Sequence, residues 1–283
     1  GLKAKVEEVA ANENATAEVK AACQEWLDTF SVGATNGVAT DKLVAALENI
    51  DCPTCKDIVN NKDFLAKKSQ WIFGGDGWAY DIGFNGVDHV LASGKDINIM
   101  VFNTEVYSNT GGQSSKATPT GAVAQFAAGG KEVKQKDLAA IAMSYGYVYV
   151  AQISMGADMN QTIKAIAEAE AYPGPSLIIA YAPCINHGIK KGMAKAQTEE
   201  KLAVQSGYWN LFRFNPAAEG KKFSLDCKPA TVDYQEFIKG EVRYTSLALK
   251  NPARAEKLFA KAEQNAKDKY AYLEKLVTLY DEK

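Results

Sequence analysis

Four short apolar segments constrain the fold of this chain more than any other feature. They are WIFGG (71–75), INIMVFN (97–103), YVYVAQIS (147–154) and SLIIAYA (176–182). Continuous apolar runs of this length are typical of strands buried on both faces of a parallel sheet. Helical patterns such as DLAAIAMSYG and ADMNQTIKAIAEAEAY lie between them. This alternation predicts an α/β fold with a doubly wound, mostly parallel sheet.

Helical extensions are predicted on both sides of this core. Residues 1–66 contain charged, Ala-rich stretches with apolar residues three or four apart, which predict a helical arm. Residues 67–215 contain the four predicted strands and form the predicted α/β core. After about Phe214 the strand pattern fades, and residues 216–283 are predicted to form a loop followed by helices, the last of them long and amphipathic.

The balance of positive and negative residues limits the kinds of partner that this chain could bind. Lys and Arg total 32 against 34 for Asp and Glu, so nothing indicates a broad basic surface for nucleic acid or anionic lipid. No apolar run reaches the roughly 18 to 20 residues of a membrane helix, and the sequence GLKAKVEEVA has no signal-peptide core. The sequence therefore predicts a cytoplasmic protein whose partners are small molecules and proteins.

The five cysteines are Cys23, Cys52, Cys55, Cys184 and Cys227. Their odd number and irregular spacing do not fit a secreted disulfide framework, so reduced thiols or metal ligands are expected. Cys52 and Cys55 form a C-x-x-C pair. Without a second pair this is weak evidence for a metal site, and two ordinary thiols beside a helix explain it equally well.

A glycine-rich segment follows the first predicted strand. Gly75 and Gly77 allow the backbone to approach an anion closely, and the next helix would point free N–H groups at the same place. Asp76 lies between them and would repel a phosphate unless a divalent cation separated the two. The segment therefore predicts a metal-bridged phosphate site at the carboxyl end of the strand.

Oxygen donors follow the second predicted strand. Asn103, Thr104, Glu105 and Val106 offer an amide, a hydroxyl and carbonyl groups at the same edge of the sheet. Mg²⁺ requires about six oxygens, so the carboxylate after the first strand needs such partners. The intervening residues 78–102 are enough for one helix and one strand, as in a βαβ crossover.

This pairing of GDG with an Asn-containing strand end resembles the signature of thiamine-diphosphate enzymes. The wording GDGWAYDIG with NTEVYSNTGGQSSKATPTGA resembles the pyruvate:ferredoxin (flavodoxin) oxidoreductases, rather than decarboxylases or transketolases, whose second half usually has NN. The resemblance covers most of residues 70–215 and implies a sheet of the thiamine-diphosphate-binding type. GDG alone would favour a generic glycine-rich turn.

The resemblance implies a role for each matching residue. Asp76, the Thr104 hydroxyl and the Val106 carbonyl would bind Mg²⁺. Asn109 occupies the position that faces the reactive carbon in this family, and we expect a polar stabilising role for it in catalysis. The residues expected to line thiamine diphosphate are Gly75, Asp76, Gly77, Trp78, Thr104, Glu105, Val106, Tyr107, Ser108 and Asn109.

Cys184 follows the fourth predicted strand, in YAPCINHG. Taken alone, it would be a buried structural thiol. In the family pattern, the cysteine of this segment is the fourth ligand of the [4Fe-4S] cluster nearest thiamine diphosphate, and His187 is expected to hydrogen-bond beside it. The other three ligands belong to C-x-x-C-G-E-T and T-G-C-S stretches, which this sequence lacks. Cys52 and Cys55 do not match those surroundings.

The activity implied by the resemblance is oxidative decarboxylation of pyruvate to acetyl-CoA and CO₂, with coenzyme A as acyl acceptor and iron–sulfur clusters passing electrons to ferredoxin or flavodoxin. The family's substrate-binding residues lie in an N-terminal domain without a match here. We therefore expect a fragment, inactive alone, that works with the remainder of the same polypeptide or other subunits as a homodimer.

Two alternatives remain. Another 2-oxoacid oxidoreductase, acting on 2-oxoglutarate or indolepyruvate, would share the same motif. A non-catalytic phosphate-binding or interface module is the second alternative, and intact Asp76 and Thr104 argue against it because a module that only binds has no need of a metal site.

A second cation site is predicted at the opposite edge of the sheet. Asp96 and Asn98 bracket the start of the second strand, and the turn AEAYPGPS precedes the fourth. Ca²⁺ would suit such a flexible set of oxygens. The remaining ligands would be carbonyl groups of Ala169, Tyr172, Gly174 and Ser176. An ordinary turn stiffened by prolines is the alternative, and the sequence slightly favours it.

Overall fold

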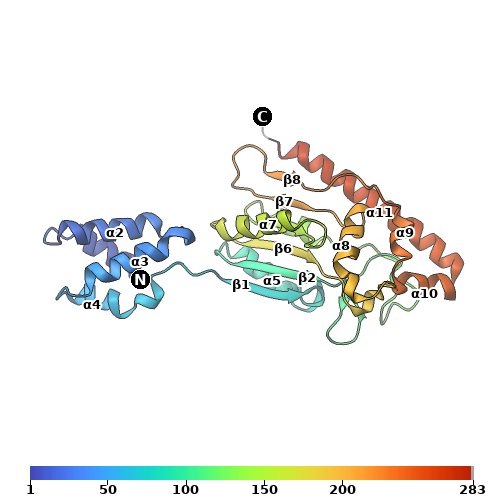
Figure 1. Cartoon of the computed structure of the whole chain (residues 1–283), viewed down its shortest axis with the longest axis horizontal. Helices are drawn as coiled ribbons and strands as arrows, with labels where there is room; N and C mark the ends of the chain where they lie inside the picture. Colours follow the sequence, from blue (N-terminus) through green and yellow to red (C-terminus); the bar gives the residue numbers. More distant parts are fainter. Residues whose placement is uncertain (282–283) are drawn as a thin grey trace. The chain divides into compact units, whose positions relative to one another are not determined.

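The computed structural model describes residues 1–281, in two compact units that divide after Gln70. The first unit is helical (Figure 1). Its elements are α1 (Leu2–Ala11), α2 (Ala17–Thr29), α3 (Gly33–Leu47), α4 (Pro53–Asn60) and a short 3₁₀ helix, Lys62–Phe64. The helices bury apolar side chains in a core of their own, which includes Val6, Trp26, Leu43 and Ile58. Within a helix the buried residues recur three or four positions apart, as Ala39, Leu43 and Leu47 do in α3, and this is the pattern of an amphipathic helix.

The second unit is built on a six-stranded sheet with the order β1-β2-β6-β5-β7-β8. Its strands are β1 (Trp71–Gly75), β2 (Asn98–Asn103), β5 (Tyr149–Ile153), β6 (Ser176–Tyr181), β7 (Phe212–Phe214) and β8 (Phe223–Leu225). β1, β2, β6 and β5 are parallel, and β7 and β8 are antiparallel. The prediction of a mostly parallel α/β sheet is confirmed. β7 and β8 were not predicted, since three residues each are too few to establish a strand pattern.

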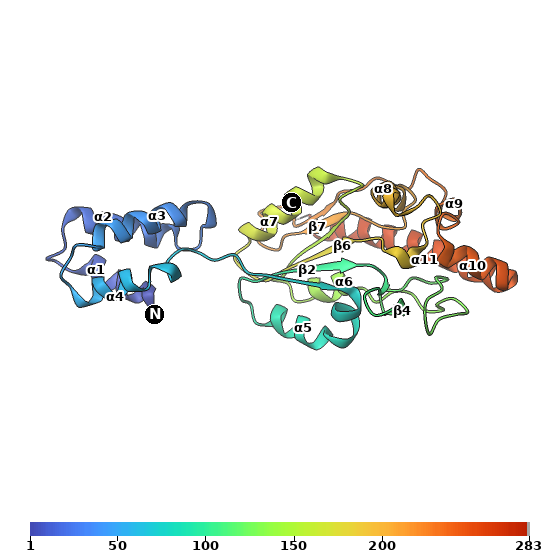
Figure 2. The same cartoon turned by 60° about the horizontal axis from the view of Figure 1, so that its bottom comes forward.

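Helices cover both faces of this sheet (Figure 2). Ile99, Leu177 and Val150 point to one face and pack with α5 (Phe84–Ala92), α6 (Leu138–Met143) and the C-terminal helix α11 (Pro252–Leu279). Met100, Ile178 and Tyr149 point to the other face, where α7 (Met159–Ala171) covers them. Side chains alternate along a strand, so strands with continuous apolar sequences bury both faces.

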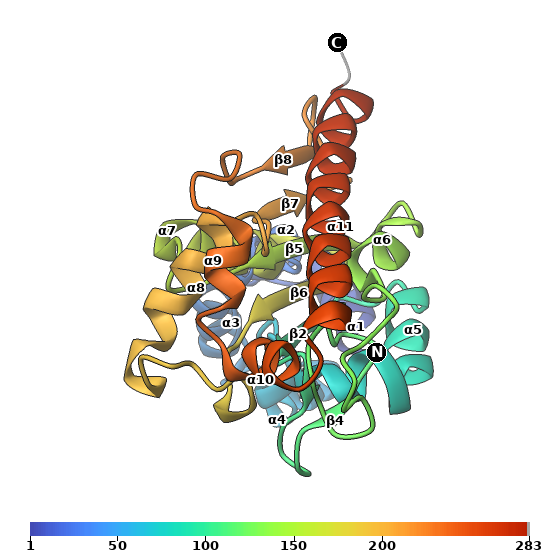
Figure 3. The same ribbon diagram turned by 90° about the vertical axis from the view of Figure 1, so that its right-hand side faces the viewer.

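The C-terminal region wraps helices around the end of the sheet. They are α8 (Ala196–Gln205), α9 (Tyr234–Ile238), α10 (Val242–Lys250) and α11. α11 runs beside β7 and β8 (Figure 3). It begins at Pro252 after Asn251, whose side-chain oxygen accepts the Arg254 N–H at 3.2 Å. Within residues 1–281, none of the helices has the length and apolar character that crossing a bilayer requires.

Candidate functional site

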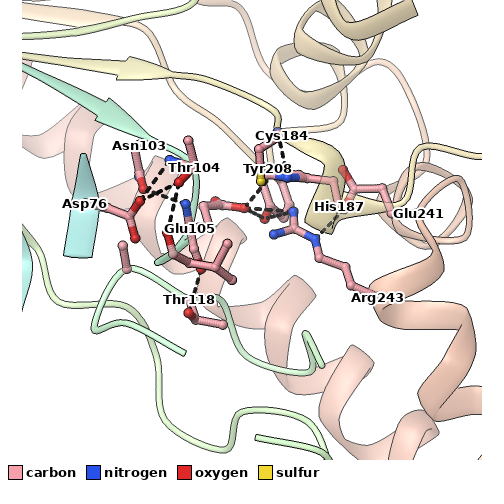
Figure 4. A network of polar contacts seen from close by, with 12 residues as sticks. Asp76, Asn103, Thr104, Glu105, Thr118, Cys184, His187, Tyr208, Glu241 and Arg243 are labelled. Carbon is pink, nitrogen blue, oxygen red and sulfur yellow. Dashed lines mark hydrogen bonds and ion pairs between the residues drawn. The ribbon is translucent and has the colours of Figure 1, made fainter. Parts of the chain in front are cut away.

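The carboxyl ends of three parallel strands meet at one edge of the sheet. β1 is followed by Asp76, β2 by Thr104, and β6 by a loop that contains Cys184. The Ala182 N–H donates to the Asn103 carbonyl at 3.0 Å, which joins the loops after β6 and β2. Figure 4 shows the polar side chains that gather there.

Asp76 is fully buried and accepts hydrogen bonds on both carboxylate oxygens. Oδ1 accepts from the Thr104 hydroxyl at 2.8 Å and from its N–H at 3.1 Å, and Oδ2 accepts from the Ser115 hydroxyl at 2.6 Å. The Thr104 oxygen also lies 2.9 Å from the Val106 carbonyl oxygen. A hydroxyl has one proton, so it donates to only one of the two at a time. The three predicted Mg²⁺ ligands therefore form a single chain of oxygen contacts.

The charge of Asp76 affects whether a cation can bind beside it. Burial raises its pKa to about 6, although hydrogen bonds from Ser115 and Thr104 oppose this shift. A nearby divalent cation would favour the ionised form. Within residues 1–281 no cluster of three or more His, Cys, Asp or Glu residues is arranged to hold a metal. One carboxylate, one hydroxyl and one carbonyl would not form such a cluster, but they are the hard oxygen donors that Mg²⁺ prefers.

The two glycines beside Asp76 have different environments. A Cβ on Gly77, the first residue of the π-helix Gly77–Ile82, would lie 2.5 Å from the Tyr107 ring, so packing alone excludes a side chain there. A Cβ on Gly75 would meet only the Phe102 carbonyl, at 4.0 Å. Packing does not explain Gly75, whereas close approach of an anion to its backbone would.

Four further residues predicted to line the cofactor lie near this edge of the sheet. A Cβ on Gly74 would lie 2.2 Å from the Trp78 ring, so the indole packs closely against the chain. Tyr107 ends β3 (Val106–Tyr107), which pairs with β4 (Gln113–Ser114). Ser108 and Asn109 follow in the connecting turn, where Ser108 is half-buried and Asn109 exposed. The structure therefore places Asn109 on the segment that contains Thr104 and Val106, two of the three proposed metal ligands.

Comparison with known proteins shows which proteins this part of the chain resembles. The family described as "Thiamine pyrophosphate enzyme, C-terminal TPP binding domain" matches residues 62–180, which include Asp76 and Thr104. The pyruvate-flavodoxin oxidoreductase of Klebsiella pneumoniae is 53% identical over 264 residues, which are 92% of this chain and 22% of that protein. The pyruvate:ferredoxin oxidoreductase of Moorella thermoacetica is 55% identical over 271 residues, 92% of this chain and 23% of that protein.

The chain contains the thiamine-pyrophosphate domain of the pyruvate:ferredoxin (flavodoxin) oxidoreductase family. The recognition based on the two strand ends is thereby confirmed. The chain spans less than a quarter of the length of these two curated relatives. A solved 2-oxoglutarate:ferredoxin oxidoreductase from Magnetococcus marinus aligns with a TM-score of 0.39 and 20% identity, over 54% of this chain and 46% of that one.

In this member of the family, the Glu105 carboxylate points into a buried network rather than toward solvent (Figure 4). Glu105 has a φ of 61°, which is unusual for a residue other than glycine. Its carboxylate lies 2.7 Å from an Arg243 nitrogen and accepts from the Tyr208 hydroxyl at 2.6 Å and from Gln135 at 3.1 Å. Glu105 was predicted to line the cofactor. Because its side chain is engaged in this network, only its backbone is available for that role.

Arg243 joins two buried carboxylates. Its Nε donates to Glu241 at 2.6 Å, on the opposite side from Glu105, and all three side chains are at most 4% exposed. Burial alone would raise the pKa of Glu105, but Arg243 and His187 hold that pKa below its ordinary value. The segment that follows β2 is therefore fixed by an ion pair to α10. Sequence reasoning missed Arg243 and Tyr208 because no local motif marks them.

Cys184 is connected to the same network through His187. The Cys184 N–H donates to His187 Nδ1 at 3.1 Å, and His187 Nε2 lies 3.6 Å from the Glu105 carboxylate. Burial raises the pKa of the Cys184 thiol, but interactions with His187 and Asn186 outweigh it, so the pKa lies below its ordinary value. The thiolate is the form of cysteine that binds metal. The geometry therefore agrees with the hydrogen bond expected of His187.

A buried carboxyl group nearby gives a testable pH dependence of stability. Burial and the charge of Glu241 raise the pKa of Glu199 from 4.5 to about 7. The folded chain thus keeps a proton that the unfolded chain releases above pH 4.5, and this stabilisation is lost as the pH rises to about 7. We expect Glu199→Gln to raise the free energy of unfolding at pH 8 by about 1–3 kcal/mol. Urea titrations at pH 4 and pH 8 would measure this as a smaller difference in the free energy of unfolding between the two pH values.

The matched change, Glu219→Gln at an exposed position, should leave that difference as it is in the wild type. Equal differences for the two variants would contradict the assignment.

The opposite edge of the sheet brings together part of the predicted Ca²⁺ site. Asn98 pairs with Ser176 across β2 and β6, and the Ser176 hydroxyl donates to the Ala169 carbonyl at 3.3 Å. The Asn98 amide donates to Glu170 at 3.2 Å, and Glu170 was not predicted. Asn98 Oδ1 is buried and has no hydrogen-bond partner within residues 1–281. The other predicted ligands, Asp96, Tyr172 and Gly174, lie before β2 and between α7 and β6.

Proposed function

We propose that this chain binds the diphosphate end of thiamine diphosphate in an enzyme that oxidatively decarboxylates pyruvate. Asp76, the Thr104 hydroxyl and the Val106 carbonyl would hold Mg²⁺. The observation that supports this most strongly is the chain of contacts among these three oxygens at the carboxyl ends of β1 and β2. In open α/β sheets, ligands bind at this edge.

The residues of the chain have separate roles in this proposal. Gly75 would let the diphosphate approach the backbone, and the first N–H groups of the π-helix after Asp76 would point toward it. Asn109 would contribute a polar contact near the reactive part of the ligand. When bound, thiamine diphosphate supplies the electron sink for decarboxylation. The rest of the lining would comprise Trp78, Glu105, Tyr107 and Ser108.

The names of the relatives support a proposal for the substrate and the electron acceptor. Pyruvate occurs in the names of both curated relatives, whereas one names flavodoxin and the other ferredoxin. We therefore propose pyruvate and coenzyme A as substrates and either small electron-transfer protein as acceptor, in the cytoplasm. The rest of the site would come from the remainder of a longer polypeptide or from other subunits, assembled as a homodimer.

Cys184 is proposed as one ligand of a [4Fe-4S] cluster that receives the electrons. Support comes from its position at the carboxyl end of β6, on the same edge as Asp76, and from the lowered pKa of its thiol. Clusters of this kind are held by thiolates. The other three ligands would come from outside this chain.

The test is an anaerobic assay of the longer polypeptide that contains this chain, beside its Cys184→Ala variant. We expect the variant to lose one cluster's iron and pyruvate-dependent reduction of ferredoxin, while binding thiamine diphosphate as before. Cys227→Ala, a change at another half-buried thiol, should leave iron and activity intact. Unchanged iron in the Cys184 variant would refute the cluster assignment.

A structural Ca²⁺ is proposed at the opposite edge, with Asp96, Asn98 and carbonyl groups of Ala169, Tyr172, Gly174 and Ser176 as ligands. The buried Asn98 oxygen without a partner supports it. We expect millimolar Ca²⁺ to raise the unfolding temperature of the chain by about 2–4 °C, which corresponds to roughly 1 kcal/mol. Asn98→Ala should abolish the shift, and an equal shift in this variant would exclude the site.

A further inference from the structure

The pair of cysteines at the start of α4 has no part in the proposed cofactor site. Cys52 is the residue that caps α4, and Cys55 lies in its first turn, in the sequence DCPTCKD. Both are free thiols. The sequence left open whether they bind a metal, and within residues 1–281 the structure has no cluster of three or more His, Cys, Asp or Glu residues suited to one. We consider the pair here for its thiol chemistry.

The two sulfurs have different environments. Cys52 is half-buried, whereas Cys55 is 3% exposed and packs in the core of the helical unit. The Cys55 N–H donates to the Cys52 sulfur at 3.4 Å. An N-cap residue in an extended conformation places its side chain over the first turn of the helix, and here that side chain is a thiol next to another thiol. One sulfur is thus accessible and the other is held beneath it.

This arrangement also separates the acidities of the two thiols. Hydrogen bonds from the Cys55 backbone N–H and from the Cys55 thiol lower the pKa of Cys52. Burial, and then the neighbouring Cys52, raise the pKa of Cys55 to about 12. The thiolate is the nucleophile in disulfide exchange, so the accessible member is the one activated to react.

We infer that Cys52 and Cys55 form a reversible dithiol–disulfide pair that exchanges with small-molecule disulfides. The inference does not depend on the proposed thiamine site. In the first step, the Cys52 thiolate attacks a disulfide, forms a mixed disulfide and releases one thiolate. In the second step, Cys55 gives its proton to solvent and attacks the Cys52 sulfur, which releases the second thiolate. The chain is oxidised by two electrons and the small disulfide is reduced to two thiols.

Oxidation has a structural consequence for α4. A disulfide sulfur carries no charge, so it is a weaker acceptor for the Cys55 N–H than a thiolate. Because residues i and i+3 on a helix are neighbours, the bond requires only a small movement of the first turn. Oxidation should therefore alter the start of α4 while leaving the core of the unit intact.

The test uses the whole 283-residue chain in buffers with graded ratios of reduced to oxidised glutathione, quenched with acid, alkylated and mapped by mass spectrometry. We expect the wild-type chain to lose two of its five free thiols in one intrachain bond between Cys52 and Cys55, and dithiothreitol to restore both. Cys55→Ser should instead accumulate one glutathione on Cys52. Cys52→Ser should form neither product at this position.

Cys227→Ser is the matched control, because the Cys227 sulfur also accepts a backbone N–H, from Leu211 at 3.3 Å. This variant should form the Cys52–Cys55 bond as readily as the wild type. Circular dichroism would establish that each variant is folded. The inference is overturned if the folded wild-type chain keeps both thiols under all ratios, or if Cys55 pairs with the neighbouring Cys23 instead.

Discussion

Replacing Asp76 with Asn is expected to weaken Mg²⁺-dependent binding of thiamine diphosphate to this chain by about 100-fold or more, since loss of residues that merely support metal ligands already costs roughly 10–100-fold. Asp76 is the one carboxylate among the proposed ligands, so the variant removes the negative charge from the cation site. Isothermal titration calorimetry with and without Mg²⁺ would measure the change. Equal affinities of variant and wild type would refute the metal site.

Loss of folding does not explain such a result. Burial raises the pKa of Asp76 to about 6, so at pH 8 the folded chain without a cation contains a buried charge that a neutral amide lacks. We therefore expect Asp76→Asn to unfold at the same denaturant concentration as the wild type or a higher one. Asp41→Asn, a change at an exposed carboxylate in α3, is the matched control and should preserve the affinity.

Replacing Arg243 with Met is expected to lower the free energy of unfolding by about 3–5 kcal/mol, because removing one partner of a buried ion pair leaves an uncompensated charge. Here the carboxylates of Glu105 and Glu241 would both lose their partner, and both are fully buried. Urea unfolding followed by tryptophan fluorescence would measure the loss. Tyr208 would keep its hydrogen bond to Glu105, so the segment that contains Glu105 should become more mobile but remain folded.

Two further variants separate the buried pair from a general effect of losing an arginine. Arg254 forms an ion pair with Glu132 at 2.8 Å, and their side chains are 37% and 67% exposed. Arg254→Met should change stability by no more than about 1 kcal/mol, since exposed pairs contribute little. Adding Glu105→Gln to Arg243→Met should recover part of the loss, because it neutralises one of the two unpaired carboxylates. Equal losses for Arg243→Met and Arg254→Met would contradict the assigned role.

The sequence was informative wherever function follows from position along a strand. The runs WIFGG and INIMVFN define β1 and β2, and parallel strands bring their carboxyl ends to one edge, so the sequence pattern was enough to predict that Asp76 and Thr104 lie together. The same argument placed Cys184 at the end of β6. The roles of these residues remain proposals.

The supporting contacts could not be predicted in this way. Arg243 reaches Glu105 from α10, and Tyr208 reaches it from the turn after α8. Such contacts depend on how helices pack around the sheet, and no spacing in the sequence encodes them. The positive φ of Glu105 was also unforeseen, since local patterns predict that conformation mainly for glycine.

The ion pair between Glu105 and Arg243 has a consequence for synthesis of the chain on the ribosome. The strands β1, β2, β5 and β6 are all complete by Tyr181, so the parallel part of the sheet can form before Arg243 has been translated. Until α10 emerges, the Glu105 carboxylate has no cationic partner from that helix, and burying it would be unfavourable. We therefore expect the segment that contains Glu105 to be fixed late, after most of the domain has been made. A nascent chain that ends before Arg243 would have a formed parallel sheet, but its Glu105 carboxylate would remain exposed to solvent. This exposed charge would distinguish incomplete chains from finished ones.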